Sequence, residues 1–514
     1  MDRFLGLRGS KLSMATIILI VGPAYFTFGY NLAVAGGLLT LESFVKQFPQ
    51  MDTINTTGAQ NKLNSNIQGA VSALFTVGGF LGALSTIPLG DLLGRRRIIF
   101  FGSILVVIGA VLMSSSYSLG QLIVARLVQG CGTGAITATV PVWQSELSGS
   151  AHRGSHVVTE GLFIAAGIAA SQWIDLGFFF IGSSSVSWRV PLIIQVPLPI
   201  LVMIFVFFMP ESPRWLLMKN HVKEAREILS ILRDEDENST AIQREIAEVE
   251  TSLEMIGSVS RWDVFKMGEK RNFHRLMLGI GGQSFSQLCG VNSITFYATI
   301  IFQQRLKLDA IKARLLGGGM TTIQIVGALA AVLTIDRLGR RPLMLISSAG
   351  MCIAMVIITG TTSTTNNQAA LIVAVVCFFI YNMSYTFGFL GLTFLYSTEV
   401  APPHLRAKIS GFSNCMTWLM NFVVVEVTPT GFDNIQYRYY IIWAVINFFI
   451  FATVFFLYPE TNGRTLEEMD EIFMLSKNIF DSRKLAASLS KREPLDHEVI
   501  TEKAMAQQVD KVLE

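Results

Sequence analysis

The chain has 514 residues, of which 51% are hydrophobic and only 15% are charged, and its mean hydropathy is +0.49. Soluble proteins average about 25% charged residues, so this composition excludes an ordinary soluble enzyme and indicates a membrane protein. The net charge of +3 at pH 7 is small. It predicts no nucleic-acid partner, because the loops of a membrane protein explain the surplus of cations.

Apolar windows long enough to cross a bilayer recur along most of the chain. A hydrocarbon core of roughly 30 Å needs about 20 apolar residues per helix. We therefore predict an all-α membrane protein with twelve transmembrane helices in two pseudo-symmetric six-helix halves, over residues 1–210 and 273–458. Helices one to six are predicted at 14–39, 66–89, 98–116, 119–143, 154–182 and 189–210, and helices seven to twelve at 273–303, 314–335, 343–362, 370–397, 407–429 and 438–458.

Two stretches outside the halves are polar. In the linker, 211–272, acidic and basic residues alternate from His221 to Lys270. This pattern predicts short surface helices without a binding role. The tail, 459–514, is also mostly charged and polar.

Basic residues gather on one side of the predicted helices, which sets the orientation of the chain. Retained loops of membrane proteins carry an excess of Lys and Arg, so we assign this side to the cytoplasm. An even number of helices then places both termini there. The loop 41–65 faces out, and Asn55 in the sequence Asn55-Thr56-Thr57 is a glycosylation acceptor if the chain enters the secretory route.

Charged motifs repeat about half a chain apart. A repeat of this period indicates two homologous halves, as in many secondary transporters. In each half an Asp-x-x-Gly-Arg-Arg motif comes first, and a Glu followed seven residues later by an Arg comes second. The charged members are Asp91, Arg95, Arg96, Glu146 and Arg153 in the first half and Asp336, Arg340, Arg341, Glu399 and Arg406 in the second.

These motifs fall at the predicted cytoplasmic ends of helices. Asp91 and Asp336 end their helices, and Gly94 and Gly339 permit a tight turn that we expect the arginines to occupy. Bidentate pairs of Arg and carboxylate tie neighbouring helices together. We predict that both clusters form a cytoplasmic gate, closed in the outward-facing state and broken as the halves rock.

Five further motifs occur in a fixed order along the chain: Gly90-Asp91-x-x-Gly94-Arg95-Arg96, Arg126-x-x-x-Gly130-x-Gly132-x-Gly134, Pro210-Glu211-Ser212-Pro213-Arg214, Gln287-x-x-Gly290-Val291-Asn292 and Pro459-Glu460-Thr461-x-Gly463. In their order and spacing they resemble the sugar porter family of the major facilitator superfamily over nearly the whole chain, in the manner of fungal hexose transporters. The resemblance implies a plasma-membrane transporter, not an enzyme, with a substrate site near the membrane midplane and no cofactor or metal. Its expected partners are a small-molecule sugar or polyol and the lipid bilayer.

A polyol binds amide side chains, which donate and accept hydrogen bonds at once, and an aromatic face. For any single amide in a span, a hydrogen bond between helices is the alternative interpretation. Several amides from both halves together predict a shared polar cavity. The resemblance places substrate ligands at Gln172 on helix five, Gln287 and Asn292 on helix seven, Gln324 on helix eight, and Trp418 and Asn421 on helix eleven.

Three departures from the family pattern bear on the substrate. Ser286-Gln287 occupies the position of the family's paired glutamines, and Gln324 occupies the position of its usual Asn. On helix ten, the run from Leu390 to Phe394 lacks two prolines and a Trp. Because prolines break helices, we expect different gating at helix ten. The expected substrate is a hexose or another hydroxylated small molecule, without a stated preference for glucose.

Helix one bears on energy coupling. Resembling proton symporters carry Asp where this chain has Asn31, and facilitators carry Asn. An amide cannot titrate, so we predict facilitated diffusion, although Arg126, the partner of that Asp in symporters, is retained. The alternative is a symporter that uses another buried acid: Asp175, expected near the outer end where water reaches it, or Glu160 or Glu426.

Two other functions remain open. The altered positions on helices seven and ten suit a transporter of a specialised metabolite or a quinate-like acid. A non-transporting sugar sensor would signal through a long cytoplasmic tail, and the tail of this chain is short for that role. No Gly-rich phosphate loop, nucleophile elbow or metal-ligand cluster appears in the sequence outside the spans, which disfavours an enzyme. The sequence specifies no oligomeric state.

Overall fold

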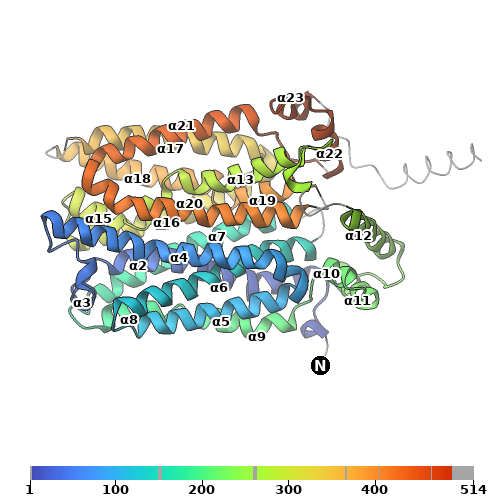
Figure 1. Cartoon of the computed structure of the whole chain (residues 1–514), viewed down its shortest axis with the longest axis horizontal. Coiled ribbons are helices and arrows are strands. Elements are labelled where there is room, and N and C mark those ends of the chain that lie inside the picture. The colour runs from blue at the N-terminus through green and yellow to red at the C-terminus, as the bar shows by residue number, and fades with distance from the viewer. Residues whose placement is uncertain are drawn as a thin grey trace, which may run out of the picture.

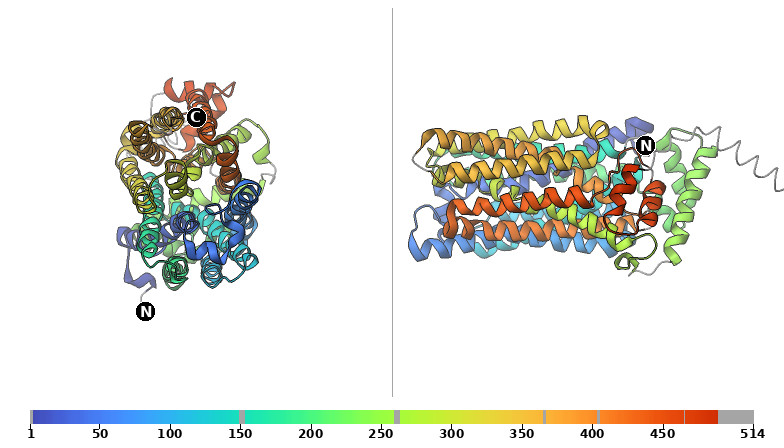
Figure 2. Two further views of the ribbon diagram at one scale, coloured as in Figure 1. Left: turned by 90° about the vertical axis from the view of Figure 1, so that its left-hand side faces the viewer. Right: turned by 90° about the horizontal axis from the view of Figure 1, so that it is seen from above.

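The computed structural model describes residues 3–148, 153–258, 263–364, 367–402, 405–464 and 466–488. Within these ranges the regular structure is helical, without a strand. Long helices run side by side along one axis of the molecule (Figure 1). Seen along that axis, the first half, coloured blue to teal, lies beside the second half, coloured lime to red (Figure 2).

Ten helical stretches of the described residues are long and apolar enough to cross a membrane. The longest of them, Lys408–Leu457, has 50 residues, more than twice the roughly 20 that one crossing needs. It contains α20 (Arg406–Ile435) and α21 (Tyr439–Leu457), separated by a turn at Gln436 with φ +49°. This stretch therefore supplies helices eleven and twelve.

Helix seven completes the twelve as a broken helix. It runs through α13 (Asn272–Leu288), α14 (Val291–Thr295) and α15 (Ala298–Ile300). The break falls at Gly290, whose φ of +94° disfavours any residue with a Cβ. A Cβ there would also lie 2.5 Å from the Trp443 ring. The predicted twelve-helix fold is confirmed, with helix seven interrupted.

The other helices follow the predicted order. The first half consists of η1 (Arg3–Gly6), helix one as α1 (Gly9–Thr16), η2 (Ile17–Val21) and α2 (Gly22–Leu38), then α3 (Glu42–Gln47), η3 (Pro49–Met51), α4 (Gly58–Leu93), α5 (Arg95–Ser114), α6 (Leu119–Leu147), α7 (Arg153–Phe179), and helix six as α8 (Val186–Ile193), α9 (Pro197–Phe205) and η5 (Val206–Phe208). The rest are α10 (Pro213–Met218), α11 (Val222–Arg233), α12 (Thr240–Ser258), η6 (Asp263–Phe265), η7 (Ile301–Arg305), α16 (Ala310–Leu338), α17 (Arg340–Thr362), α18 (Gln368–Gly388), α19 (Leu392–Glu399), η8 (Gln436–Arg438), α22 (Leu466–Leu475) and α23 (Asp481–Ser488).

Helix ten is broken despite its missing prolines. Residues 389–391 separate α18 from α19, and Phe389 has φ −128° and ψ −29°. At this break a Cβ on Gly161 of α7 would lie 3.0 Å from the amide nitrogen of Gly391. The break expected to depend on proline is thus present without it, where two backbones approach each other closely.

The bundle has two different ends. The linker end carries α10, α11 and α12 together with α22, α23 and η1, while α3 lies at the opposite, distal end (Figure 1). The linker contains surface helices, as predicted, and α11 buries the apolar side chains of Ile228, Leu229 and Leu232. Asn55 is exposed, and its amide donates to the Asp52 carboxylate at 3.0 Å. Residues 489–514 of the predicted tail lie outside the described residues.

Candidate substrate site and gates

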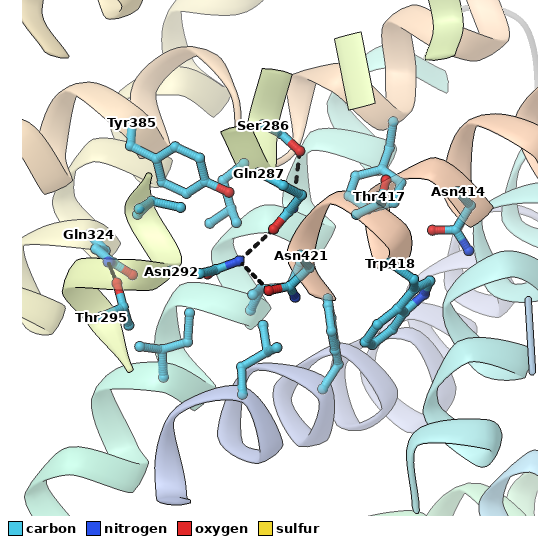
Figure 3. Close-up of a pocket in the computed structure, with 17 residues that line it drawn as sticks. Ser286, Gln287, Asn292, Thr295, Gln324, Tyr385, Asn414, Thr417, Trp418 and Asn421 are labelled. Carbon is cyan, nitrogen blue, oxygen red and sulfur yellow. Dashed lines mark hydrogen bonds between the residues drawn. The ribbon is translucent and has the colours of Figure 1, made fainter. Parts of the chain in front are cut away.

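A cavity lies between the two halves, and α4 packs on α20 and α7 on α16 beside it. Among the described residues, seventeen line it, of which ten have polar side chains and none is charged. An uncharged polar cavity suits an uncharged hydroxylated ligand. The polar residues, labelled in Figure 3, are Ser286, Gln287, Asn292, Thr295, Gln324, Tyr385, Asn414, Thr417, Trp418 and Asn421.

Asn292 connects the amides of this cavity. Its Nδ2 donates to Oε1 of Gln287 at 2.5 Å and to Oδ1 of Asn421 at 2.9 Å (Figure 3). The Nε2 of Gln287 donates to the Ser286 hydroxyl at 3.1 Å. Asn292 lies two residues after the break at Gly290, so the break turns amides of α13 and α14 toward α20. Each of these amides can exchange its present partner for a ligand hydroxyl.

Gln324 on α16 forms a second polar wall. Its Nε2 donates to Oδ1 of Asn382 at 2.5 Å. Its Oε1 is buried and has no hydrogen-bond partner among the described residues. A buried acceptor without a donor costs free energy, so a ligand hydroxyl that donates to it would be favoured.

Trp418 supplies the aromatic wall. Its indole lies 5.5 Å from the Phe28 ring and 5.7 Å from the Phe75 ring, measured between centroids. Gly79 of α4 lets the indole approach, because a Cβ at that position would overlap the ring. The apolar face of a sugar ring packs well on such a surface.

Gln172 is the one predicted ligand that does not line the cavity. Its Nε2 instead donates to the carbonyl of Ala33 on α2 at 3.1 Å, within the first half. Of the described residues in the first half, only apolar ones line the cavity, so the expectation of polar side chains from both halves is wrong in this structure. These apolar residues are Phe28, Leu32, Ile164 and Ile168.

Sequence reasoning missed several polar members of the lining. Asn414 precedes Trp418 by four residues, and Asn421 follows it by three. That spacing places all three on one face of a helix, a signal that was available from the sequence. The sequence carries no comparable signal for Thr417. Its hydroxyl donates to Gln283 of α13 at 2.8 Å, a contact between distant helices.

Each half carries an Arg–Glu pair at its linker end. Arg95, the first residue of α5, donates to both carboxylate oxygens of Glu146 at 3.0 and 3.1 Å. Arg340, the first residue of α17, donates to Glu399 at 2.9 and 3.2 Å. Both arginines are buried, and such bidentate pairs are strong. The arginines begin the next helix instead of occupying the turn itself, which Gly94 makes with φ +85°.

Two further carboxylates complete these clusters. Glu211 accepts hydrogen bonds from the backbone amides of Arg95 and Arg96 at 3.1 and 3.2 Å. Glu460 accepts from those of Arg340 and Arg341 at 2.9 and 3.0 Å. Each carboxylate thus covers the N-terminus of a helix, where free N–H groups and the helix dipole favour an anion. The signal was the Pro-Glu pair that follows helix six and helix twelve.

The surroundings of Glu211 are tightly packed. A Cβ on Gly94 would lie 2.8 Å from its Oε2. Burial raises the pKa of Glu211, while the amide of Ser212 and the guanidinium of Arg96 act in the opposite direction. The carboxyl therefore depends on its donors to remain ionised in this position.

The predicted aspartates are peripheral. The Asp91 side chain is 65% exposed and lies 3.8 Å from Arg95, and the Asp336 side chain is 62% exposed and lies 3.2 Å from Arg340. Exposed pairs of this kind contribute about 0–1 kcal/mol. The glutamates, and not the aspartates, are the principal acidic partners.

The remaining predicted gate arginines differ in position. Arg96 donates to the carbonyl of Met209 at 2.8 Å and Arg341 to that of Phe455 at 2.9 Å, so each holds the end of a neighbouring helix. Arg406 begins α20. The side chain of Arg153, the first residue of α7, lies outside the described part of the structure.

Residues 15–473 match the family model described as "Sugar (and other) transporter". The chain belongs to the sugar transporter family. Within the major facilitator superfamily it is 34% identical to the sugar transporter STL1 of Saccharomyces cerevisiae, over 91% of this chain and 82% of that protein. It is 29% identical to the glucose transporter GlcP of Staphylococcus epidermidis, over 79% of this chain and 89% of that protein. These relatives are transporters and not enzymes.

A solved structure has the same fold as this sugar transporter family member. The proton:xylose symporter XylE bound to 6-bromo-6-deoxy-D-glucose aligns with a TM-score of 0.78 at 21% identity, covering 90% of this chain and 100% of that one. The likeness establishes the twelve-helix fold of the major facilitator superfamily.

The predicted coupling residues of this transporter are buried. Asn31 on α2 and Arg126 on α6 are 2% and 5% exposed, and neither side-chain atom of the Asn31 amide has a hydrogen-bond partner among the described residues. Asp175 on α7 is 2% exposed, so the expectation that water reaches it is wrong in this conformation. The Asp175 side chain packs against Gly37 of α2.

Arg314 of α16 is the cation that acts on Asp175 across the two halves. The guanidinium of Arg314 donates to the Thr40 hydroxyl at 2.5 Å and stacks on the Phe179 ring at 4.0 Å. Helix eight of this sugar transporter is thereby fastened to helices one and five beyond the cavity, toward the distal end.

Replacing Glu211 with alanine is expected to lower thermal stability in detergent. The change leaves the amides of Arg95 and Arg96 without their acceptor at a buried helix end, which costs about 1–3 kcal/mol. Thermal unfolding followed by size-exclusion chromatography measures the effect. Glu224→Gln on α11, an exposed position, is the control. Equal midpoints for both variants would contradict the capping role.

Proposed function

We propose that this protein carries a neutral hydroxylated solute, a sugar or a related polyol, across a membrane by alternating access of its two halves. The observation that carries the proposal is the cavity lined by ten polar and no charged side chains. The amides of this cavity can form hydrogen bonds with solute hydroxyl groups, and the Trp418 indole can pack against the C–H face of a sugar ring. A quinate-like acid would need a cationic partner, which no residue lining the cavity offers.

The solute is further selected by an apolar side of the cavity. Leu390 and Phe394 line it at positions where sugar porters carry other residues. Phe28 and Ile164 of the first half line the same cavity. We therefore propose a solute with one hydroxylated and one apolar face, such as a hexose, and assign no preference for glucose. The names of STL1 and GlcP as sugar and glucose transporters support this class.

The linker end is cytoplasmic in this proposal, and the membrane is the plasma membrane. Arg95, Arg96, Arg340 and Arg341 all lie at the linker end, where the positive-inside rule places the cytoplasm. The two Arg–Glu clusters then form the cytoplasmic gate. They hold helix ends together within each half and loosen when the cavity opens inward.

Transport is proposed to be facilitated diffusion. Asn31 is a buried amide, and an amide cannot bind and release a proton during the transport cycle. The second candidate is proton symport through Asp175, favoured by its burial between the halves. Against this second candidate, the guanidinium of Arg314 already interacts electrostatically with the Asp175 carboxyl.

Uptake measurements test the function. Labelled hexoses and smaller polyols would be offered to cells that lack their own carriers, with and without a protonophore, and surface expression would be measured in parallel. We expect uptake that stops at equilibrium and ignores the protonophore. Accumulation above equilibrium that collapses with the protonophore would replace facilitated diffusion by symport. No uptake of any neutral polyol at normal surface expression would overturn the transport proposal and favour a sensor.

A further inference from the structure

Glu160 on α7 is a buried acid that has no part in the cavity or the gate clusters. Its side chain is 0% exposed. Neither carboxyl oxygen has a hydrogen-bond partner of normal length and angle among the described residues. The hydroxyl of Tyr25 is the described side-chain group that interacts with this carboxyl, and no described basic side chain does so. An ionised carboxylate in such a place costs several kcal/mol, so the group stays neutral by keeping its proton.

Glu160 lies between the cavity and the linker end. Ile164, one helical turn further along α7, lines the cavity. The neighbouring Gly161 packs on the break of helix ten, where its Cβ would lie 3.0 Å from the amide nitrogen of Gly391 and 3.7 Å from the carbonyl carbon of Leu390. Leu390 itself lines the cavity. This contact joins the two halves, so it separates when the cavity opens toward the linker end.

Tyr25 on α2 is the titratable group that acts on Glu160. Most other titratable groups that the structure describes on helices packed against α7 interact with other partners, and Lys312 and Arg337 of α16 are exposed. Tyr30 and Arg314 act on Asp175, Arg126 acts on Tyr297, Glu146 pairs with Arg95, Asp336 and Glu399 pair with Arg340, Arg189 donates to the carbonyls of Ser114 and Ser116, and Tyr396 donates to the carbonyl of Pro459.

We propose that Glu160, beside Tyr25, is a proton-binding site that exchanges its proton with the cytoplasm each time the transporter opens inward. Opening lets water reach the carboxyl, and a hydrated glutamate is ionised at neutral pH. One proton leaves to the cytoplasm on opening and returns from there on closing, so no proton crosses the membrane. The inference rests on the proposed function, since the transport cycle supplies the opening.

The consequence is a dependence of inward opening on pH. Because opening releases a proton, a higher pH favours the inward-open state. One group shifts the equilibrium by at most about tenfold per pH unit. Asp175, the other buried acid of α7, lies toward the distal end beside Arg314 and is expected to leave this dependence unchanged.

Labelling of a cysteine tests the proposal without any substrate. Ala138 lines a second cavity near the linker end, beside Arg95 and Gly411. The rate at which a maleimide labels Ala138→Cys in the full-length protein would be measured between pH 6 and 8, and corrected for the parent protein. The same rate in Ala138→Cys with Glu160→Gln removes the pH dependence of the thiol itself. We expect the ratio of the two rates to rise at least fivefold over this range.

A ratio that stays constant would overturn the proposal, whether or not a transported solute has been found. The matched variant Asp175→Asn should keep the rise. The side chain of His156, four residues before Glu160, lies outside the described part of the structure, so His156→Ala is measured too. If the ratio stays constant and His156→Ala instead removes a pH-dependent rise of the labelling rate, the proton belongs to the histidine. If Glu160→Gln does not fold, Tyr25→Phe must move the midpoint of the pH profile, and an unchanged midpoint overturns the proposal.

Discussion

Replacing Asn292 with alanine is expected to raise the half-saturation concentration of the transported solute by about 30-fold. Its amide donates to both Gln287 and Asn421 (Figure 3). Removing it deletes one ligand and leaves a solute hydroxyl without a partner in the bound state. A neutral hydrogen bond contributes about 0.5–1.5 kcal/mol and a buried unsatisfied group costs about 1–3 kcal/mol. A combined loss near 2 kcal/mol corresponds to this change in affinity.

The matched control is Gln172→Ala. Gln172 is a buried amide on a transmembrane helix, but it bonds to Ala33 and does not line the cavity. We expect its half-saturation concentration to stay within about twofold of wild type, while thermal stability falls by the loss of one hydrogen bond. Uptake kinetics at equal surface expression measure both variants. If Gln172→Ala weakened binding as much as Asn292→Ala, the cavity would not be the substrate site.

Replacing Arg95 with alanine is expected to slow turnover at least tenfold with little change in half-saturation. The change leaves Glu146, whose side chain is 10% exposed, without its bidentate partner, so that Arg214 is the remaining described cation that interacts with it. Breaking one partner of such a pair costs about 3–5 kcal/mol, and conformations that hydrate Glu146 escape this cost. The gate should therefore remain open toward the linker end. Arg340→Ala should act in the same way through Glu399.

Two comparisons make this prediction specific. Asp91→Asn removes only an exposed partner at 3.8 Å, so its turnover should fall less than threefold. The double variant Arg95→Met with Glu146→Leu removes both members of the pair, so neither is left buried without the other, and turnover should recover relative to Arg95→Ala. The measurements are uptake rates at saturating solute and maleimide labelling of Ala138→Cys. A pure loss of affinity in Arg95→Ala would contradict the gate assignment.

Helix ten shows where inference from family pattern reaches its limit. The absence of two prolines led to the expectation of altered gating there, yet residues 389–391 still interrupt the helix. The interruption lies where Gly161 and Gly391 approach each other closely. A proline is a local signal that can be read from the sequence. A contact between two backbones from different halves leaves no such signal.

The sequence by itself determined the twelve helices, the two halves and the pairing motifs of the proposed gate. Apolar length, the positive-inside bias and the repeat of Asp-x-x-Gly-Arg-Arg with a later Glu are local signals, and each acts through residues close in the chain. The identities of five of the six proposed substrate ligands also followed from motif position, because helix register is preserved around Gly290 and Arg406.

Only the tertiary structure decided which partner each buried polar group has. Gln172 and Asn292 are both amides on membrane helices, yet one bonds within its own half and the other joins a cavity. Glu211 and Glu146 are both acids at helix ends, yet one holds backbone amides and the other a guanidinium. Glu160 has neither kind of partner among the described residues. A hydrogen bond depends on distance and angle between helices far apart in sequence, so the packing of those helices determines it.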